Sequence, residues 1–197
     1  MIGIKNRKGE TLLEVLIALT LVVVTAAAAS SAVISATKSL SLSKNYLVAQ
    51  NLGSEALEAI KNIRDTNWMK FPINKDECWL VVEEISKAED CATSDRLEYI
   101  STAGAVNDYV IKFENNRWTA AKQTQTMEAN INAFAMREIG GKYTTEITTE
   151  APSFYRVARI KGETAGESIT VQIIVKWYEG AKLYEITGTE ILTNYLE

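Results

Sequence analysis

Histidine is absent from this 197-residue sequence, and cysteine and proline occur only twice each. Without imidazole, histidine-rich zinc sites, Ser-His-Asp triads and Cys-His dyads are excluded. The sequence also has no Gly-rich phosphate loop and no nucleophile elbow. Because no set of residues suggests a reaction or a cofactor, we expect a protein that is not an enzyme and has no catalytic site.

An excess of basic residues is also absent, since the formal net charge is -4. A nucleic-acid-binding domain usually shows a basic face, so no nucleic-acid partner is predicted. Two acidic pairs, Glu83-Glu84 and Glu89-Asp90, lack the spacing of a calcium loop. We interpret them as a solvated surface and predict no metal site. Arg156, Arg159 and Lys161 are interpreted as a small basic strand edge that protects against aggregation.

The two cysteines, Cys78 and Cys91, are too few for a structural zinc site without other ligands. A pair this close, outside a C-x-x-C spacing, predicts one disulfide if the domain is exported. The alternative is two unpaired buried thiols.

The N-terminus has a basic segment that ends at Gly9, followed by an apolar stretch from Leu12 to about Ala36 whose only charge is Glu14. At ~1.5 Å per residue this stretch is ~37 Å long as a helix, enough to cross a ~30 Å hydrocarbon core. The basic flank favours a cytoplasmic N-terminus, which places the C-terminal part outside the membrane.

Two ordinary interpretations of this segment are open. One is a cleaved secretory signal, with Val15–Thr25 as its apolar region and Ala26–Ala29 as its cleavage site. The other is an ordinary single-span anchor. Both leave Glu14 unexplained, because a carboxylate in the apolar zone costs a few kcal/mol on insertion scales.

The segment from Gly9 to Ala18, GETLLEVLIA, resembles the class III signal of type IV prepilins and pseudopilins. The resemblance implies that prepilin peptidase cuts after Gly9 and methylates the new amine of Glu10. It also implies that Glu14, five residues into the mature chain, pairs with the N-terminal amine of a neighbouring subunit during assembly. A buried charge is tolerated when it is paired, and such a pair would set the axial register between subunits.

One residue departs from the family pattern. The first mature residue is usually phenylalanine, and here it is Glu10. Glu10 and Glu14 lie one helical turn apart, where two charged carboxylates repel each other. This departure favours a minor or initiating subunit. Residues 56–68 also resemble the helix end of minor pilins described as type IV pilus modification proteins.

A helical pattern continues beyond the apolar stretch. Apolar residues recur in steps of three or four at Val48, Leu52, Ala56, Ala59, Ile60 and Ile63. This spacing predicts one apolar stripe on a helix that runs from Glu10 to about Arg64. We expect the helix to end near residues 65–67, before the break that Pro72 enforces.

The C-terminal part alternates between apolar and polar residues. Residues 108–114 and a return from Trp118 predict one hairpin, and residues 169–177 and 183–192 predict another. Residues 119–139 fit either a short helix or a loop. A helix with one apolar stripe and a sheet with one apolar face bury each other. The predicted fold class is therefore α+β and resembles the pilin fold, with a long N-terminal helix packed on an antiparallel sheet.

These observations predict four segments: a leader at 1–9, a transmembrane and filament-core helix at 10–37, its amphipathic continuation at 38–66, and an extracellular globular domain at 67–197. The resemblance implies a structural, minor subunit of a type IV pilus or related filament. Implied partners are other pilins, prepilin peptidase, and an assembly platform with its ATPase. The resemblance also implies that the chain is a single-pass inner-membrane protein before assembly and part of an extracellular filament afterwards. The alternatives are a secretion-system pseudopilin and an exported binding domain with a cleaved signal.

Overall fold

The computed structural model describes residues 10–145, 149–164 and 167–194. The chain forms two compact units, residues 1–44 and 45–197. Helix α1, Glu10–Lys70, contributes to both units. It continues several residues past the predicted end at 65–67 and stops just before Phe71. The stop is explained by Pro72, whose ring disfavours helical backbone at the residue before it.

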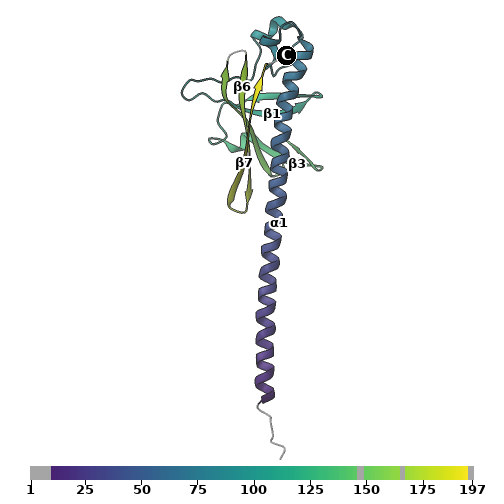
Figure 1. The fold of residues 1–197 in the computed structure, drawn as a ribbon, viewed down its shortest axis with the longest axis vertical. Coiled ribbons are helices and arrows are strands. Elements are labelled where there is room, and N and C mark those ends of the chain that lie inside the picture. Colours follow the sequence, from purple (N-terminus) through teal and green to yellow (C-terminus); the bar gives the residue numbers. More distant parts are fainter. Residues whose placement is uncertain (1–9, 146–148, 165–166, 195–197) are drawn as a thin grey trace, which may run out of the picture. The chain divides into compact units, whose positions relative to one another are not determined.

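The second unit contains short helices and a seven-stranded antiparallel sheet in its described part (Figure 1). The helical turns are α2, Lys75–Cys78, and the 3-10 turns Ala88–Ala92 and Ile131–Phe134. The strands are β1 Asp108–Glu114, β2 Arg117–Lys122, β3 Ala135–Ile139, β4 Lys142–Thr144, β5 Phe154–Thr164, β6 Ser168–Glu179 and β7 Lys182–Thr193. This architecture confirms the predicted α+β class.

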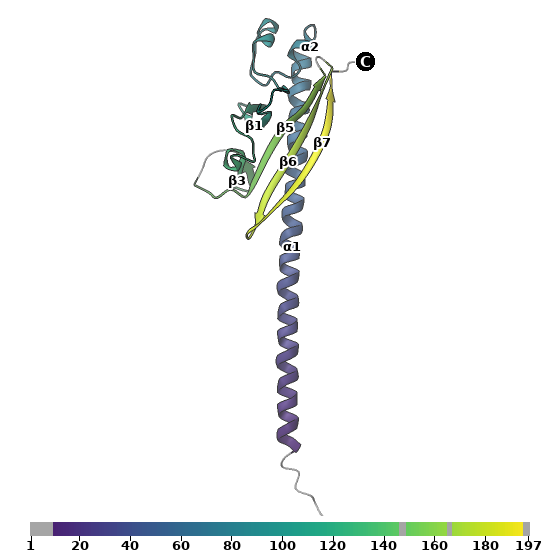
Figure 2. The ribbon, with the colours of Figure 1, turned by 90° about the vertical axis from the view of Figure 1, so that its left-hand side faces the viewer.

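Both predicted hairpins are present. β1 and β2 pair down to Glu114 opposite Arg117, and the two asparagines between the strands, Asn115 and Asn116, both have positive φ. Such a pair matches the left-handed backbone of a two-residue hairpin turn. β6 and β7 pair along their whole lengths, which Figure 2 shows beside β5. Sequence periodicity and turn residues therefore located these four strands.

The central strand of the sheet is β5. One of its edges pairs with β6, and its other edge pairs with β1 near Arg159 and with β3 near Tyr155. The predicted basic strand edge is therefore wrong for two of its three residues. Arg156 is buried against α1, and Arg159 forms an ion pair with the buried Asp108. Only Lys161 is exposed.

The main core lies between the C-terminal part of α1 and one face of the sheet. Of the predicted helix stripe, Val48 is half-buried and the other five residues are buried. Opposite them, the five alternating residues of β6 are at most 1% exposed: Ile169, Val171, Ile173, Val175 and Trp177. At roughly 25 cal/mol per Å² of apolar surface, this burial is the main source of stability for the unit.

A smaller core lies on the other face of the sheet. The sequence left residues 119–139 open between a helix and a loop, but the structure places the end of β2 and all of β3 in this range. Residues 123–134, between these strands, cross this face and pack Met127 and Phe134 against Val157. The crossing is held by Asp108, which accepts a hydrogen bond from the backbone N–H of Met127 at 2.9 Å. Its carboxylate also accepts two hydrogen bonds from the guanidinium of Arg159. Asp108 therefore ties this segment to β1 and β5.

Tyr109 anchors the segment that leads into β1. Its hydroxyl donates to the carbonyl oxygen of Arg96 at 3.2 Å and accepts from the backbone N–H of Glu98 at 3.1 Å. The side chain is almost fully buried. Burial raises the pKa of the Tyr109 phenol to about 12, because the charged form is poorly solvated there.

This pKa predicts a loss of stability at high pH. The unfolded pKa is about 10, so the neutral phenol contributes fully below pH 10 and loses that contribution as the pH rises toward 12. We expect the free energy of unfolding to fall more steeply over this range in the wild type than in Tyr109→Phe. Urea unfolding of the full chain in lipid nanodiscs, followed by tryptophan fluorescence, measures both slopes. Equal slopes in the two proteins would contradict the assignment of this loss of stability to Tyr109.

Gly53 of α1 generates a second prediction. A Cβ added at this position would lie 3.8 Å from Cδ1 of Ile186 and 3.9 Å from Cγ2 of Val175, which is ordinary van der Waals contact. Glycine inside a helix costs about 1 kcal/mol relative to alanine. Gly53→Ala is therefore expected to raise the free energy of unfolding by roughly 0.5 to 1 kcal/mol. Ser54→Ala, at an exposed neighbouring position, is the comparison variant, and it should raise the free energy of unfolding by less because serine is less unfavourable than glycine in a helix. A destabilised Gly53→Ala protein would refute this account.

Candidate assembly helix and disulfide-closed cap

The first unit contains the N-terminal part of α1. Every large apolar side chain between Leu12 and Ile34 is more than half exposed, on all sides of the helix. Contiguous apolar surface of this extent is unfavourable in water and marks a membrane or protein contact. By length and composition, α1 is the one helix in the described part of the chain that is suited to cross a bilayer.

Several hydroxyl groups in the N-terminal part of α1 are satisfied within the helix. Thr20, Thr25 and Ser30 donate to backbone carbonyl oxygens three or four residues earlier, at 2.8 to 3.0 Å. Ser31 and Thr37 do the same. A polar group in hydrocarbon must find its partner inside its own segment or in a neighbouring helix. These residues therefore remain compatible with apolar surroundings.

The predicted site residues lie at the start of α1. Gly9 lies outside the described residues, and Glu10 is the first helical residue. The side chain of Glu14 is exposed on the apolar helix. Within the part of the chain that the structure describes, no hydrogen bond or ion pair involves Glu14. Its carboxylate is thus available to a group outside this chain.

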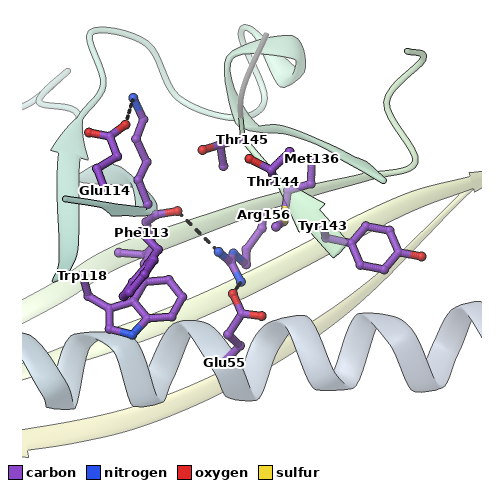
Figure 3. Close-up of a pocket in the computed structure, with 11 residues that line it drawn as sticks. Glu55, Phe113, Glu114, Trp118, Met136, Tyr143, Thr144, Thr145 and Arg156 are labelled. Carbon is purple, nitrogen blue, oxygen red and sulfur yellow. Dashed lines mark hydrogen bonds and ion pairs between the residues drawn. The ribbon is translucent and has the colours of Figure 1, made fainter. Parts of the chain in front are cut away.

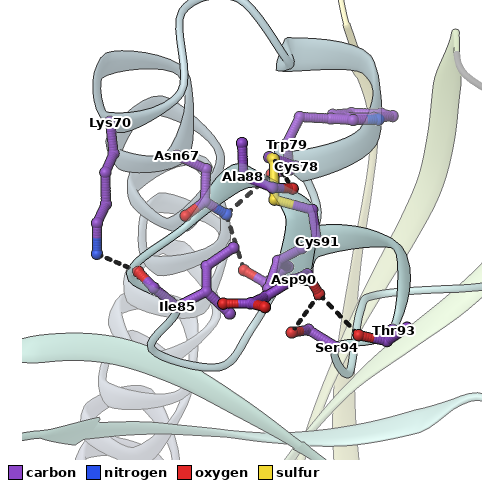
Figure 4. The surroundings of a disulfide bond; sticks show 11 residues. Asn67, Lys70, Cys78, Trp79, Ile85, Ala88, Asp90, Cys91, Thr93 and Ser94 are labelled. Carbon is purple, nitrogen blue, oxygen red and sulfur yellow. Dashed lines mark hydrogen bonds between the residues drawn. A yellow bond between two sulfur atoms is a disulfide. The ribbon is translucent and has the colours of Figure 1, made fainter.

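The C-terminal end of α1 is covered by residues 71–97, here called the cap. A disulfide joins Cys78 and Cys91, with their Cα atoms 5.0 Å apart (Figure 4). The two cysteines form a small buried cluster with Phe71, Val81 and Ile85. Within the cap, Val81 and Arg96 form one isolated antiparallel bridge.

Asn67 connects α1 to the cap. Its side-chain amide is buried and donates to the carbonyl oxygens of Val81 at 2.8 Å and Trp79 at 3.4 Å. Lys70 also donates to the carbonyl oxygen of Ile85. Sequence reasoning missed Asn67, because an asparagine near an expected helix end normally indicates a turn. The partners that give it another role lie 12 and 14 residues later.

The acidic pairs of the cap do not assemble into a metal site. Among the described residues, no group of three or more carboxylates or thiols is arranged to hold a metal ion. Glu83 and Glu84 are exposed, as are Glu89 and Asp90.

The fold and the exposed apolar helix together define a class of protein: an α+β chain of pilin-like architecture with a membrane-suited N-terminal helix. The comparison with protein families then identifies the prokaryotic N-terminal methylation motif at residues 4–30. The comparisons with curated proteins and with solved structures give no match. The motif, which is the class III signal of type IV pilins, supports a type IV pilin-like family for this chain.

The disulfide of the cap generates a prediction about local stability. A disulfide that closes a loop of this size stabilises a fold by about 3 kcal/mol in the chain-entropy description. In Cys78→Ser/Cys91→Ser we expect faster amide hydrogen exchange across residues 67–97, because Asn67 and the buried cluster lose their constraint. Exchange in β6 and β7 should remain unchanged and serves as the internal control. Uniform acceleration across the second unit would show that the cap is not a separate element.

Proposed function

We propose that this chain is a minor structural subunit of a type IV pilus or a related filament. The observation that carries the proposal is a single carboxylate, Glu14, in an otherwise apolar exposed helix whose sequence matches the N-terminal methylation motif. A lone buried carboxylate costs free energy unless it meets a positive group. In a filament of such helices, the free amine of a neighbouring chain is a suitable group.

The maturation that we propose starts with cleavage after Gly9, which removes residues 1–9 and leaves Glu10 at the N-terminus. Residues 10–37 then form the membrane span and, later, the filament core. Apolar packing between these helices supplies most of the assembly energy, as it does between helices in membranes. Pairing of Glu14 with the neighbouring amine fixes the axial register. Residues 38–66 continue the helix, and residues 67–197 lie outside the membrane.

The partners in this proposal are prepilin peptidase, other pilin subunits, and an assembly platform with its ATPase. Glu10 supports a minor role over a major one. A carboxylate at this position lies one turn from Glu14, and the two charges repel each other. In a filament made of many copies, every subunit would add this unfavourable energy.

Two linked measurements test the proposal. Intact mass and N-terminal sequencing of the mature protein should give a chain that starts at Glu10. A start near Ala29 would instead support an exported domain with an ordinary cleaved signal, and would overturn the proposal.

The second measurement is incorporation into sheared filaments. In Glu14→Ala we expect a stable membrane protein whose incorporation falls by roughly tenfold or more, since an unpaired buried amine costs above about 1.4 kcal/mol. Glu58→Ala is the control, because it removes an exposed carboxylate from the globular part of the same helix. Normal incorporation of Glu14→Ala would contradict the pairing role.

A further inference from the structure

A cleft in the second unit lies between α1 and the hairpins β1–β2 and β3–β4 (Figure 3). It consists of three adjoining hollows that share Glu55 and Trp118 as lining residues. The hollow that extends between Trp118 and Tyr143 has a volume of about 510 Å³. This lies within the range of small-molecule sites, roughly 300 to 1,000 Å³.

Three aromatic rings from different strands surround the cleft. Figure 3 shows Phe113 and Trp118 on one side of Arg156 and Tyr143 on the other side. Phe113 and Trp118 contact edge to face, with ring centroids 5.1 Å apart. Tyr143 contacts Phe154 edge to face at 5.3 Å, and its hydroxyl lies 3.3 Å from a carboxylate oxygen of Glu138. The rings are therefore held in place before any ligand arrives, which lowers the entropic cost of binding.

The floor of the cleft is an ion pair. Nη1 of Arg156 lies 2.9 Å from Oε1 of Glu55, and the same guanidinium donates to the carbonyl oxygens of Leu52 and Ile111. The arginine side chain is 3% exposed, whereas that of Glu55 is 42% exposed. The arginine thus fixes the glutamate, whose exposed carboxylate presents hydrogen-bond acceptors to the cleft.

The charges around the cleft cancel. Three ion pairs lie within its lining: Arg156–Glu55, Lys61–Glu58 and Lys112–Glu114. Of the two other charged lining residues, Asp65 pairs with Arg64 at 2.8 Å, whereas Lys142 forms no ion pair with the described residues. The acidic and basic residues of the lining are equal in number, so a highly charged ligand would gain no net attraction from the cleft as a whole. A wholly apolar ligand would desolvate the Glu55 carboxylate without replacing its hydrogen bonds, which is unfavourable.

We propose that this cleft binds a neutral oligosaccharide built of flat, β-linked pyranose rings. Such a ring exposes C–H groups on its faces and hydroxyl groups around its rim. The C–H faces pack on Trp118 and Tyr143, and rim hydroxyls donate to the Glu55 carboxylate and accept from Lys142. The cleft is built from the globular unit alone, so the inference is independent of the proposed role of the N-terminal helix.

The test uses the full chain in lipid nanodiscs, which avoids detergents with sugar head groups. Cellotetraose and tetra-N-acetylchitotetraose are titrated separately, and binding is followed by tryptophan fluorescence and calorimetry. We expect saturable binding of at least one probe, and weaker binding of the α-linked, curved maltotetraose. Absence of saturation with both β-linked probes at tens of millimolar would overturn the proposal. Equal binding of maltotetraose would also overturn it.

Variants assign the binding to the cleft. Trp118→Ala and Tyr143→Ala should each lower the affinity by roughly tenfold, the scale of a lost aromatic contact. Glu55→Gln, which keeps the shape of the side chain, should lower it less.

Tyr99→Ala is the matched control, since it removes a partly exposed tyrosine outside the cleft, and near-UV circular dichroism checks the fold of each variant. If Trp118→Ala does not fold, Trp118→Phe, which retains a smaller aromatic ring, is measured in its place. Unchanged affinity in folded Trp118 and Tyr143 variants would refute the assignment.

Discussion

The packing of α1 against β6 is the contact on which the second unit depends. The helix presents one buried stripe, from Ala49 to Ile63, and β6 presents one continuous apolar face to it. The sheet extends outward from this contact, because β5 and β7 pair with the two edges of β6. The cap then covers the C-terminal end of α1, and the crossing segment at 123–134 covers the face of the sheet opposite α1. Each of these additions is held by a buried polar residue rather than by apolar area alone.

Three buried polar residues hold different parts of the second unit: one lies on each face of the sheet, and one lies at the end of α1. On the α1 face, Arg156 reaches from β5 to backbone carbonyls of α1 and β1. On the other face, Asp108 holds Arg159 and the backbone of Met127. At the end of α1, Asn67 holds the cap. Specific hydrogen bonds of this kind fix how irregular segments sit on a core that apolar contact alone would leave less defined.

Local sequence patterns were sufficient for the elements whose periodicity is unbroken. The steps of three or four in α1 and the strict alternation of β6 depend only on neighbouring residues, and the structure confirms both. Long-range pairing was not accessible in the same way. Arg156 appeared to belong to a basic edge because its partner Glu55 lies 101 residues earlier. The range 119–139 remained ambiguous because its partners lie outside that sequence window: β2 pairs with β1, β3 pairs with β5, and Asp108 holds Met127. Glu14 could be singled out from the sequence because its apolar context is also local, and its role in assembly stays a prediction.

The position of the Arg156–Glu55 pair has a mechanical consequence. Sliding α1 along the sheet by one helical turn would displace Glu55 by about 5.4 Å. This movement would separate the carboxylate from Arg156 and leave a guanidinium buried without its counter-ion, a state that costs several kcal/mol. The ion pair therefore fixes the position of the helix along the sheet. A pulling force along α1 would meet a discrete energetic step at this point, so the globular unit resists being sheared off its own helix.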